Sequence, residues 1–260
     1  MMEEIFGKGT VSEMDFASNP EAARKAINAF VSKNSNGKIP ELLAPGKILP
    51  STLFCLVNAL YFKGEWAQKF DVAETKNGTF YSPSGTVQTP LMHQVTKVNY
   101  YEGQNFQAIA LPYIGNNMSM VVVLPGQGSH FEPSHDFYNA NFLWQSSKQT
   151  VDVTLPRFEV RTQIELTDML TQTGLTGLRY PEMSSAAGEV KGINGVTQAV
   201  FKVDEFGGEG AAATAISGVK GLNARPEIKT FRADHPFYFA VMDHSTGTIL
   251  FEGHITDPSH

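Results

Sequence analysis

The chain has only one cysteine among its 260 residues, and charged residues make up only 18% of it. A single cysteine can form no disulfide bond within the chain. We interpret this residue, Cys55, as a buried structural thiol, because it lies in an apolar, strand-like run. No apolar run reaches the roughly 20 residues that span a bilayer. We therefore expect a folded protein with no membrane partner.

The sequence also lacks the motifs of several enzyme classes. Its seven histidines are scattered, without a His-Glu-x-x-His motif or the Cys/His spacing of a zinc site. There is no Gly-x-Ser-x-Gly elbow for a nucleophilic serine. Gly207-Gly-Glu-Gly210 is not followed by the Gly-Lys-Ser/Thr of a phosphate loop. We expect no enzyme, no catalytic residue, no metal and no cofactor.

Positive charge is scarce as well, since the net charge is -6 and the pI is near 5.6. Binding to phosphate backbones needs a basic surface, so nucleic acid is excluded as the main partner. The opening Met-Met-Glu-Glu lacks the features of a signal peptide, and we expect none in this chain. The sequons at Asn77 and Asn117 matter only in a secreted protein. The compartment stays open, with an extracellular location favoured.

Apolar residues make up 42% of the chain, and their spacing predicts a helix and several strands. The helix begins at Ser18-Asn-Pro, with a capping residue and a proline in the first turn, and Gly37 can end it. Its expected apolar side is Ala23, Ala26, Ile27, Phe30 and Val31. Residues 52–62 form a nearly continuous apolar run, which predicts a strand covered on both faces.

Further along the chain, strands are expected at 118–124 and 151–160, a helix at 164–173, and a hairpin at 237–255 that turns at Ser245-Thr-Gly247. Strands dominate, and no β-α-β alternation is present. The residues therefore predict an α+β domain built on antiparallel sheet.

Residues 202–216 begin as a strand and continue into a run of very small side chains. A period of two places Gly208, Gly210, Ala212, Thr214 and Ile216 on one face. That face carries no charge and nothing bulky before Ile216. We expect that it can be buried, while Glu209 points to solvent.

Four blocks resemble the serpin family. Glu205-Phe-Gly-Gly-Glu-Gly-Ala-Ala-Ala-Thr214 is similar to the family's hinge, and Phe231-Arg-Ala-Asp-His-Pro-Phe237 with Gly247–Gly253 and Pro258 is similar to its C-terminal signature. Leu56–Trp66 resembles a third block, and Leu111-Pro-Tyr113 with Ser119–Pro125 resembles a fourth. The blocks stand in the family's order over nearly the whole chain.

The resemblance implies one serpin-like domain over 1–260. It would hold a large, mostly antiparallel central sheet with the amphipathic helix across it, a second C-terminal sheet or barrel, and a reactive-centre loop at about 205–228. The N-terminal helices and strands of complete serpins are missing before Glu3–Phe16. We expect this to leave apolar surface on the sheet, which favours a homo-oligomer or a rearranged core.

The implied function is inhibition of a serine protease by a suicide-substrate trap. The protease attacks the loop, forms an acyl-enzyme, and is carried away as the loop inserts into the large sheet. The implied hinge residues are Glu205, Gly207, Gly208, Glu209, Gly210, Ala211, Ala212, Ala213 and Thr214. The missing N-terminal elements predict ready insertion, so that even an uncut chain could be relaxed.

Two counts by the family's spacing place the scissile bond after different residues. One gives Gly221 and the other gives Leu222, before Asn223. Leu222 ranks first because an apolar side chain fills a chymotrypsin-like pocket. Lys220 ranks second and Arg225 third, and both would suit a trypsin-like protease.

The resemblance also assigns structural roles. Asn58 matches an amide beneath the centre of the large sheet, and Thr197 stands where its usual histidine partner would be. Trp66 matches an aromatic residue where insertion begins, although a core tryptophan is an equally good account. Arg157 and Glu205 occupy positions whose charges approach each other, and an exposed pair contributes at most ~1 kcal/mol.

Two other functions remain open at this stage. One is a binding or carrier protein that keeps the serpin fold, which the unusual hinge residues Phe206 and Gly210 favour. The other is a protease substrate that is cut without trapping. Small residues on the inserting face favour the inhibitor.

Overall fold

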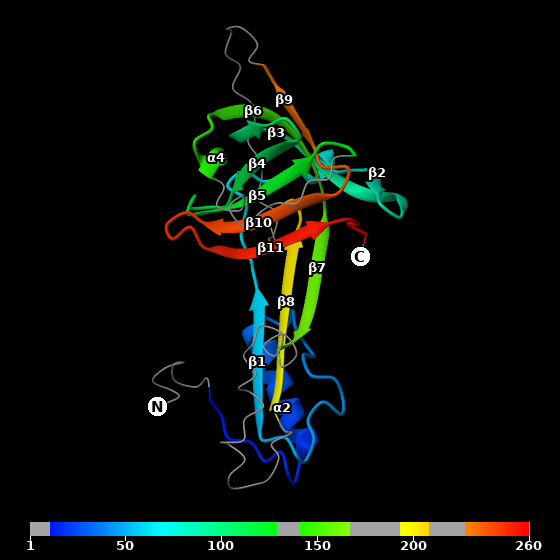
Figure 1. Cartoon of the computed structure of the whole chain (residues 1–260), viewed down its shortest axis with the longest axis vertical. Helices are drawn as coiled ribbons and strands as arrows, with labels where there is room; N and C mark the ends of the chain where they lie inside the picture. Colours follow the sequence, from blue (N-terminus) through cyan, green and yellow to red (C-terminus); the bar gives the residue numbers. More distant parts are fainter. Residues whose placement is uncertain (1–10, 129–140, 167–192, 208–226, 260) are drawn as a thin grey trace. The chain divides into compact units, whose positions relative to one another are not determined.

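The structure is a computed structural model of the whole chain, and it describes residues 11–128, 141–166, 193–207 and 227–259 (Figure 1). The chain divides into two compact units. Unit 1 consists of residues 1–61 and 161–200, and unit 2 consists of residues 62–160 and 201–260. Among the described residues, no helix has both the length and the apolar character of a membrane-crossing segment.

The helix expected after Ser18 is α2 (Pro20–Asn34) in unit 1. The side chain of Asn19 caps it by accepting a hydrogen bond from the Ala22 N–H at 3.1 Å, and Pro20 fits the first turn. After the helix ends, Asn36 and Gly37 both have positive φ, which turns the chain away from the helix axis. The expected proline in the first turn is thus confirmed, whereas the cap is Asn19, one residue after Ser18, and the helix ends at Asn34, three residues before Gly37.

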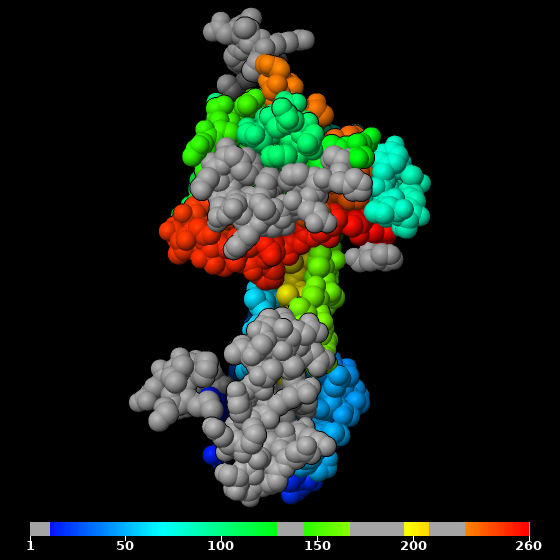
Figure 2. All heavy atoms as spheres, viewed as in Figure 1, coloured from blue at the N-terminus to red at the C-terminus, as the bar shows by residue number. Residues whose placement is uncertain are grey.

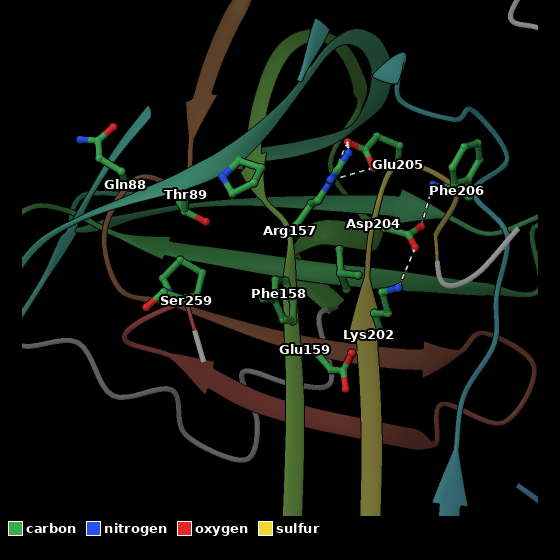
Figure 3. Close-up of a pocket in the computed structure, with 13 residues that line it drawn as sticks. Gln88, Thr89, Arg157, Phe158, Glu159, Lys202, Asp204, Glu205, Phe206 and Ser259 are labelled. Atoms are coloured by element: carbon green, nitrogen blue, oxygen red, sulfur yellow. Dashed lines mark hydrogen bonds and ion pairs between the residues drawn. The ribbon is translucent and has the colours of Figure 1, made fainter. Parts of the chain in front are cut away.

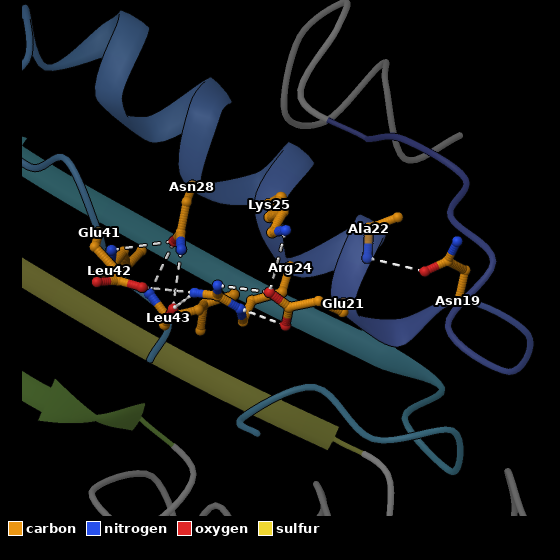
Figure 4. A network of polar contacts seen from close by, with 9 residues as sticks. All are labelled: Asn19, Glu21, Ala22, Arg24, Lys25, Asn28, Glu41, Leu42 and Leu43. Carbon is orange, nitrogen blue, oxygen red and sulfur yellow. Dashed lines mark hydrogen bonds and ion pairs between the residues drawn. The ribbon is translucent and has the colours of Figure 1, made fainter. Parts of the chain in front are cut away.

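The buried face of α2 differs from the predicted one, since Ala26 and Phe30 are exposed. Two polar residues, Arg24 and Asn28, are buried instead. Asn28 donates to the Leu43 carbonyl at 2.9 Å and accepts from the Leu42 and Leu43 N–H groups, while Arg24 donates to the same carbonyl at 2.7 Å (Figure 4). Residues 41–43 provide hydrogen-bond partners for the Arg24 and Asn28 side chains, so these polar residues can be buried. A prediction from apolar spacing alone does not find them.

Unit 1 contains a three-stranded sheet in the order β1 (Phe54–Tyr61), β8 (Ile193–Val203), β7 (Phe158–Glu165). Strands β1 and β8 run parallel and are paired from Phe54↔Ile193 to Tyr61↔Val200. Helix α2 packs on this sheet, because one apolar cluster joins helix residues to both strands. Its members include Ile27, Val31, Val57, Val196 and Val200. The helix therefore lies on the predicted strand.

The expectation that β1 is covered on both faces is wrong for the described structure. Leu53, Phe54 and Leu56 are 56%, 39% and 45% exposed. Strand β1 is the end strand of the described sheet, and α2 and the segments next to it cover only one side of it. The apolar surface expected on this sheet is thus present among the described residues. Cys55 is half-buried in the α2 cluster, and burial raises the pKa of its thiol to about 11.

Unit 2 contains an eight-stranded sheet that is antiparallel except for one parallel pair, β6 with β9. In spatial order its strands are β11 (Ile249–Ile255), β10 (Phe237–Asp243), β5 (Met118–Pro125), β4 (Phe106–Pro112), β3 (Gly85–Glu102), β6 (Lys148–Pro156) and β9 (Lys229–Arg232), while β2 (Lys76–Ser82) pairs with β3. Two short helices, η1 (Val72–Glu74) and α4 (Asn141–Trp144), accompany it. In the space-filling view the β2–β3 hairpin, in cyan, stands at the rim of this unit (Figure 2).

Strand β5 is buried on both faces of the eight-stranded sheet. Met120, Val122 and Leu124 belong to an aromatic-rich cluster on one side, and Val121 and Val123 belong to a smaller cluster on the other. The period of two distributes successive side chains between these clusters. The apolar runs at 118–124 and in the 237–255 hairpin were therefore correctly predicted as strands.

Three predictions about the elements need correction. The sheet that contains residues 52–62 was expected to be the larger one, but only three of its strands are described. The larger described sheet contains the C-terminal hairpin. It is extended by β3, whose 18 residues pair in turn with β2, β4 and β6. The single strand at 151–160 is two strands, β6 and β7, interrupted at Arg157. The predicted helix at 164–173 is wrong for Ile164 and Glu165, which end β7, and its part from 167 onward lies outside the described residues.

Candidate functional site

The predicted hinge begins where β8 ends, and there the chain is held by five residues that we call the loop anchor: Trp66, Thr75, Arg157, Glu205 and Gly207. All five lie in unit 2. Gly207 is the last described residue before 227. The anchor therefore determines the point at which the reactive-loop segment leaves the folded chain.

Glu205 is the centre of the anchor, and its side chain is only 2% exposed. The Arg157 Nε–H donates to both carboxylate oxygens, at 2.7 and 2.9 Å (Figure 3), and the Thr75 hydroxyl also donates to Oε1. Burial by itself would raise the pKa of Glu205, but the hydrogen bonds from Arg157 and Thr75 outweigh it and lower this pKa below its usual value of 4.5. Glu205 is thus held as a carboxylate.

The predicted approach of Arg157 and Glu205 is confirmed, but the pair is not an exposed one. Because the carboxylate is buried, the limit of ~1 kcal/mol for surface pairs does not apply to it. Loss of the arginine would leave a buried charge without its main partner, which is strongly unfavourable. Thr75 was missed by the sequence analysis, since a threonine after a short 3-10 helix gives no local signal of a partner 130 residues away.

The backbone of the anchor is held as firmly as its carboxylate. Three successive carbonyls accept hydrogen bonds from one segment: that of Asp204 from Trp66 Nε1–H at 2.9 Å, that of Glu205 from the Phe70 N–H at 3.0 Å, and that of Phe206 from the Trp66 N–H at 2.9 Å. Trp66 is 2% exposed and stacks on Tyr113, with ring centroids 4.6 Å apart. Trp66 is therefore both a core residue and a clamp on the start of the loop.

Gly207 closes the anchor in a conformation that only glycine adopts easily. Its φ is +107°, and a Cβ atom there would stand 2.5 Å from the Gly64 carbonyl oxygen and 2.7 Å from the Trp66 nitrogen. Both neighbours are backbone atoms, which have little freedom to move aside. A side chain at this position would displace the strand end from its clamp.

An open cavity of about 610 Å³ lies beside the anchor, lined by residues of β3, β7 and β8 and by Pro258 and Ser259 (Figure 3). Its two basic side chains are already paired, Arg157 with Glu205 and Lys202 with Asp204 at 3.6 Å. Among the described residues, no group of three or more His, Cys, Asp or Glu side chains is arranged to hold a metal ion.

Asn58 and Thr197 lie in unit 1, at directly opposed positions of the parallel β1–β8 ladder. The Asn58 Nδ2 donates to Thr197 Oγ1 at 3.1 Å, so the residue at the position of the usual histidine is in contact with Asn58. The pair is not buried as expected, because Asn58 is exposed. It therefore links the two strands by a solvated hydrogen bond.

The remaining predicted site residues lie outside the described residues. These are the hinge residues Gly208, Glu209, Gly210, Ala211, Ala212, Ala213 and Thr214, and the scissile-bond candidates Lys220, Gly221, Leu222, Asn223 and Arg225.

Comparison with known proteins places the chain in a family. A model described as "Serpin (serine protease inhibitor)" matches residues 2–258. An uncharacterized serpin-like protein of Thermococcus kodakarensis is 37% identical over 263 residues, which cover 97% of this chain and 61% of that protein. Serpin B11 of Homo sapiens is 35% identical over 98% of this chain and 68% of its own length. The chain thus spans about two thirds of the length of these relatives.

Solved structures confirm the predicted fold class. Uncleaved ovalbumin superimposes with a TM-score of 0.75 at 26% identity, covering 94% of this chain and 65% of its own. Maspin gives a TM-score of 0.78 at 23% identity, covering 94% of this chain and 68% of its own. At this identity the similarity is evidence for the fold only. The matched family is one of protease inhibitors and not of enzymes. From its first residues to its last strand, this chain belongs to the serpin family.

Proposed function

We propose that this protein inhibits a serine protease by offering the segment after Gly207 as a substrate and inserting it, once cut, between β1 and β8. The observation that carries the proposal is the parallel pairing of these two strands over eight residue pairs. Residues 204–207 join this segment to Val203, the C-terminal end of β8. The segment therefore needs only to reverse direction to run back along β8.

Strand direction makes this insertion favourable. A segment that reverses after β8 is antiparallel to β8, and also antiparallel to β1, because β1 and β8 are parallel. Insertion would replace one parallel ladder by two antiparallel ladders, which are slightly more stable per residue. The small alternate residues from Gly208 to Thr214 allow one face of the new strand to be buried.

The described state is the one before insertion. β1 and β8 are direct hydrogen-bonded neighbours from Phe54↔Ile193 to Tyr61↔Val200, with no strand between them. The β1–β8 pair is therefore closed in this structure, and relaxation of an uncut chain stays a prediction. Full opening requires the loss of a ladder eight residue pairs long.

The loop anchor gives insertion a fixed starting point. Arg157 and Thr75 hold the Glu205 carboxylate, and the Trp66 segment holds three carbonyls. Movement thus begins at Gly207, and the strand that forms is in register with β8. A fixed register matters, because a shift of one residue would turn the small face to the wrong side.

In the proposed chemistry the serine of the protease attacks the carbonyl carbon of the scissile bond and expels the new amino terminus. The product is an acyl-enzyme ester. Insertion must be completed before water hydrolyses this ester. Leu222 remains the first candidate for the residue that carries the ester, for a chymotrypsin-like protease, and Lys220 the second, for a trypsin-like protease.

A panel of serine proteases, followed by denaturing gel electrophoresis, tests the proposal. An inhibitor gives a stable covalent complex of the protease with the N-terminal part of the chain, and the C-terminal fragment is released on the gel. Mass spectrometry of that fragment locates the cut. A substrate gives only the cleaved chain, and a carrier protein stays untouched. Either of these last two results with every protease contradicts the proposal.

Gly207→Ala tests the role of the anchor in that assay. Because the added Cβ meets backbone atoms at 2.5 and 2.7 Å, we expect less complex and more cleaved chain than the unchanged protein gives. Gly115→Ala is the matched control, since Gly115 has φ +89° but a Cβ added there would meet nothing within 4 Å. Equal complex yields from both variants would show that the anchor has no role in the mechanism.

Gly210→Arg should convert the inhibitor into a substrate.

A further inference from the structure

We propose that a second cavity, in unit 2, binds a small aromatic carboxylate. The cavity has a volume of about 300 Å³ and is lined by residues of β3, β4, β5, α4 and β6 and of the turns after β4 and β10. Figure 1 shows α4 beside the part of the sheet that contains β3 and β4. None of its lining residues belongs to the loop anchor. The proposal therefore stands independently of protease inhibition.

Two lysines give the cavity a positive charge. Asn99 of β3 pairs directly with Lys148 of β6, so Lys97 and Lys148 occupy diagonal positions on one face of the antiparallel pair. Such positions are about 7–8 Å apart. No carboxylate is among the described residues that line the cavity. Within the described part of the chain, neither lysine has an ion pair, although the protein as a whole has a net charge of -6.

An aromatic wall lies next to these charges. Trp144 of α4 contacts His244 edge-on, with ring centroids 4.5 Å apart and an angle of 62° between the planes. The His244 ring is held by the Asn116 carbonyl, 3.0 Å from Nδ1. A carbonyl can only accept, so Nδ1 carries a proton, and Nε2 remains for a ligand. Ala110 and Pro112 add apolar lining.

The short helix that carries Trp144 is itself fixed to the sheet. Asn99 donates through Nδ2 to the Leu143 and Ser146 carbonyls at 3.3 and 2.9 Å, and Leu143 is fully buried. Trp144 is thus presented by a rigid support. A preformed site of this kind loses little conformational entropy when a ligand binds.

The lining determines the chemical class of the ligand. Two ammonium groups favour an anion, and charge-assisted hydrogen bonds to a carboxylate are the strong ones. The aromatic and apolar wall favours a flat ring, which stacks well on such side chains. A volume near 300 Å³ is at the small end of ligand cavities and suits one or two rings. A bare inorganic anion would leave the apolar wall in contact with water.

Titration with 1-naphthoate, followed by calorimetry and by quenching of tryptophan fluorescence, tests this proposal. We expect 1-naphthoate to bind at least roughly tenfold more tightly than the neutral isostere 1-naphthamide, because only the acid meets the lysines. Binding of 1-naphthoate should weaken as salt increases. Absence of binding, or equal affinity for acid and amide, would overturn the proposal.

Variants identify the site. Lys97→Gln/Lys148→Gln should lower the affinity for 1-naphthoate roughly tenfold or more. Lys25→Gln/Lys33→Gln, in α2, makes the same change in net charge at residues that do not line the cavity, and should leave the affinity unchanged. All four lysines are exposed, so the variants should fold. Trp144→Leu should abolish the fluorescence change that 1-naphthoate causes. If both double variants bind equally, the acid binds elsewhere and the proposal fails.

Discussion

Strands β1 and β5 are both apolar runs of eight residues, yet their burial is opposite. In β5 every residue after the first is buried, whereas in β1 no residue is. β5 has a hydrogen-bonded neighbour on each side and an apolar cluster on each face. β1 has one described neighbour and one covered face. Composition therefore identifies a strand, while its neighbours decide how deeply it is buried.

The difference also separates two roles. The eight-stranded sheet of unit 2 is a packed scaffold, whose cluster includes the stacked pair Phe201 and Phe239 with centroids 4.9 Å apart. The β1–β8 pair of unit 1 is held by a ladder, a solvated side-chain bond and an apolar cluster on one face only. Under the proposed function, β1 and β8 must separate to admit the cut segment. Weak side-chain packing makes that opening possible.

The largest expected effect comes from cleavage within residues 218–225. If the cut segment joins β1 and β8, about eight ladder hydrogen bonds are gained, each worth roughly 1 kcal/mol. The Tm should then rise by roughly 20 °C, at ~2–4 °C for each kcal/mol. Differential scanning calorimetry before and after cleavage measures the change. An unchanged Tm would mean that the β1–β8 pair does not accept the segment.

Matched leucine substitutions sharpen the comparison between the strands. Leu124 in β5 is 5% exposed, and Leu124→Ala should lower the free energy of unfolding by about 3 kcal/mol, as in other cores. Leu56 in β1 is 45% exposed, and Leu56→Ala should lower it by less than about 1 kcal/mol. Urea denaturation gives both values. A loss above about 2 kcal/mol for Leu56→Ala would show that another surface, such as a second copy of the chain, covers this face in solution.

Replacing the anchor carboxylate should give a smaller, pH-dependent effect. Because the pKa of Glu205 in the folded protein is lowered below 4.5, its stabilisation is present above pH 4.5 and is lost as the pH falls through the folded-state pKa. Glu205→Gln should therefore be less stable than the unchanged protein by about 2 kcal/mol at pH 7. This difference in the free energy of unfolding between the two proteins should disappear at acidic pH.

Glu252→Gln is the control for that measurement, since Glu252 is an exposed residue of β11 in the same unit. It should show no comparable loss of stability at pH 7. A gap between Glu205→Gln and the unchanged protein that stays constant down to pH 3 would refute the role assigned to the carboxylate charge.

The smallest effect is expected for the bond that links β1 and β8. A double-mutant cycle of Asn58→Leu and Thr197→Val should give a coupling energy of ~0.5 kcal/mol, because the hydrogen bond between the two side chains is exposed to solvent. The rate of insertion after cleavage, followed by fluorescence, should nevertheless rise in each variant. A coupling above about 2 kcal/mol would mean that Asn58 is shielded from water.

Local signals predicted the elements well where the cause is local. Asn19 and Pro20 begin α2 through hydrogen bonding and a fixed φ within one turn, and the period of two in 118–124 and 237–255 gave the right strands. The error at 164–173 has a local cause too. Residues 158–165 have no strict apolar alternation, since most of β7 is solvent-exposed, and pairing with β8 decides their conformation.

The amino-acid sequence by itself determined the family, through four ordered blocks, and with it the pairing of Arg157 with Glu205. Only the tertiary structure decided that Glu205 is buried, that Thr75 is its third partner, and that Gly207 faces the backbone of residues 64–66. Burial and distant partners depend on which segments meet in space, and residues 75 and 205 meet although 130 positions separate them along the chain. No pattern along the chain carries that information.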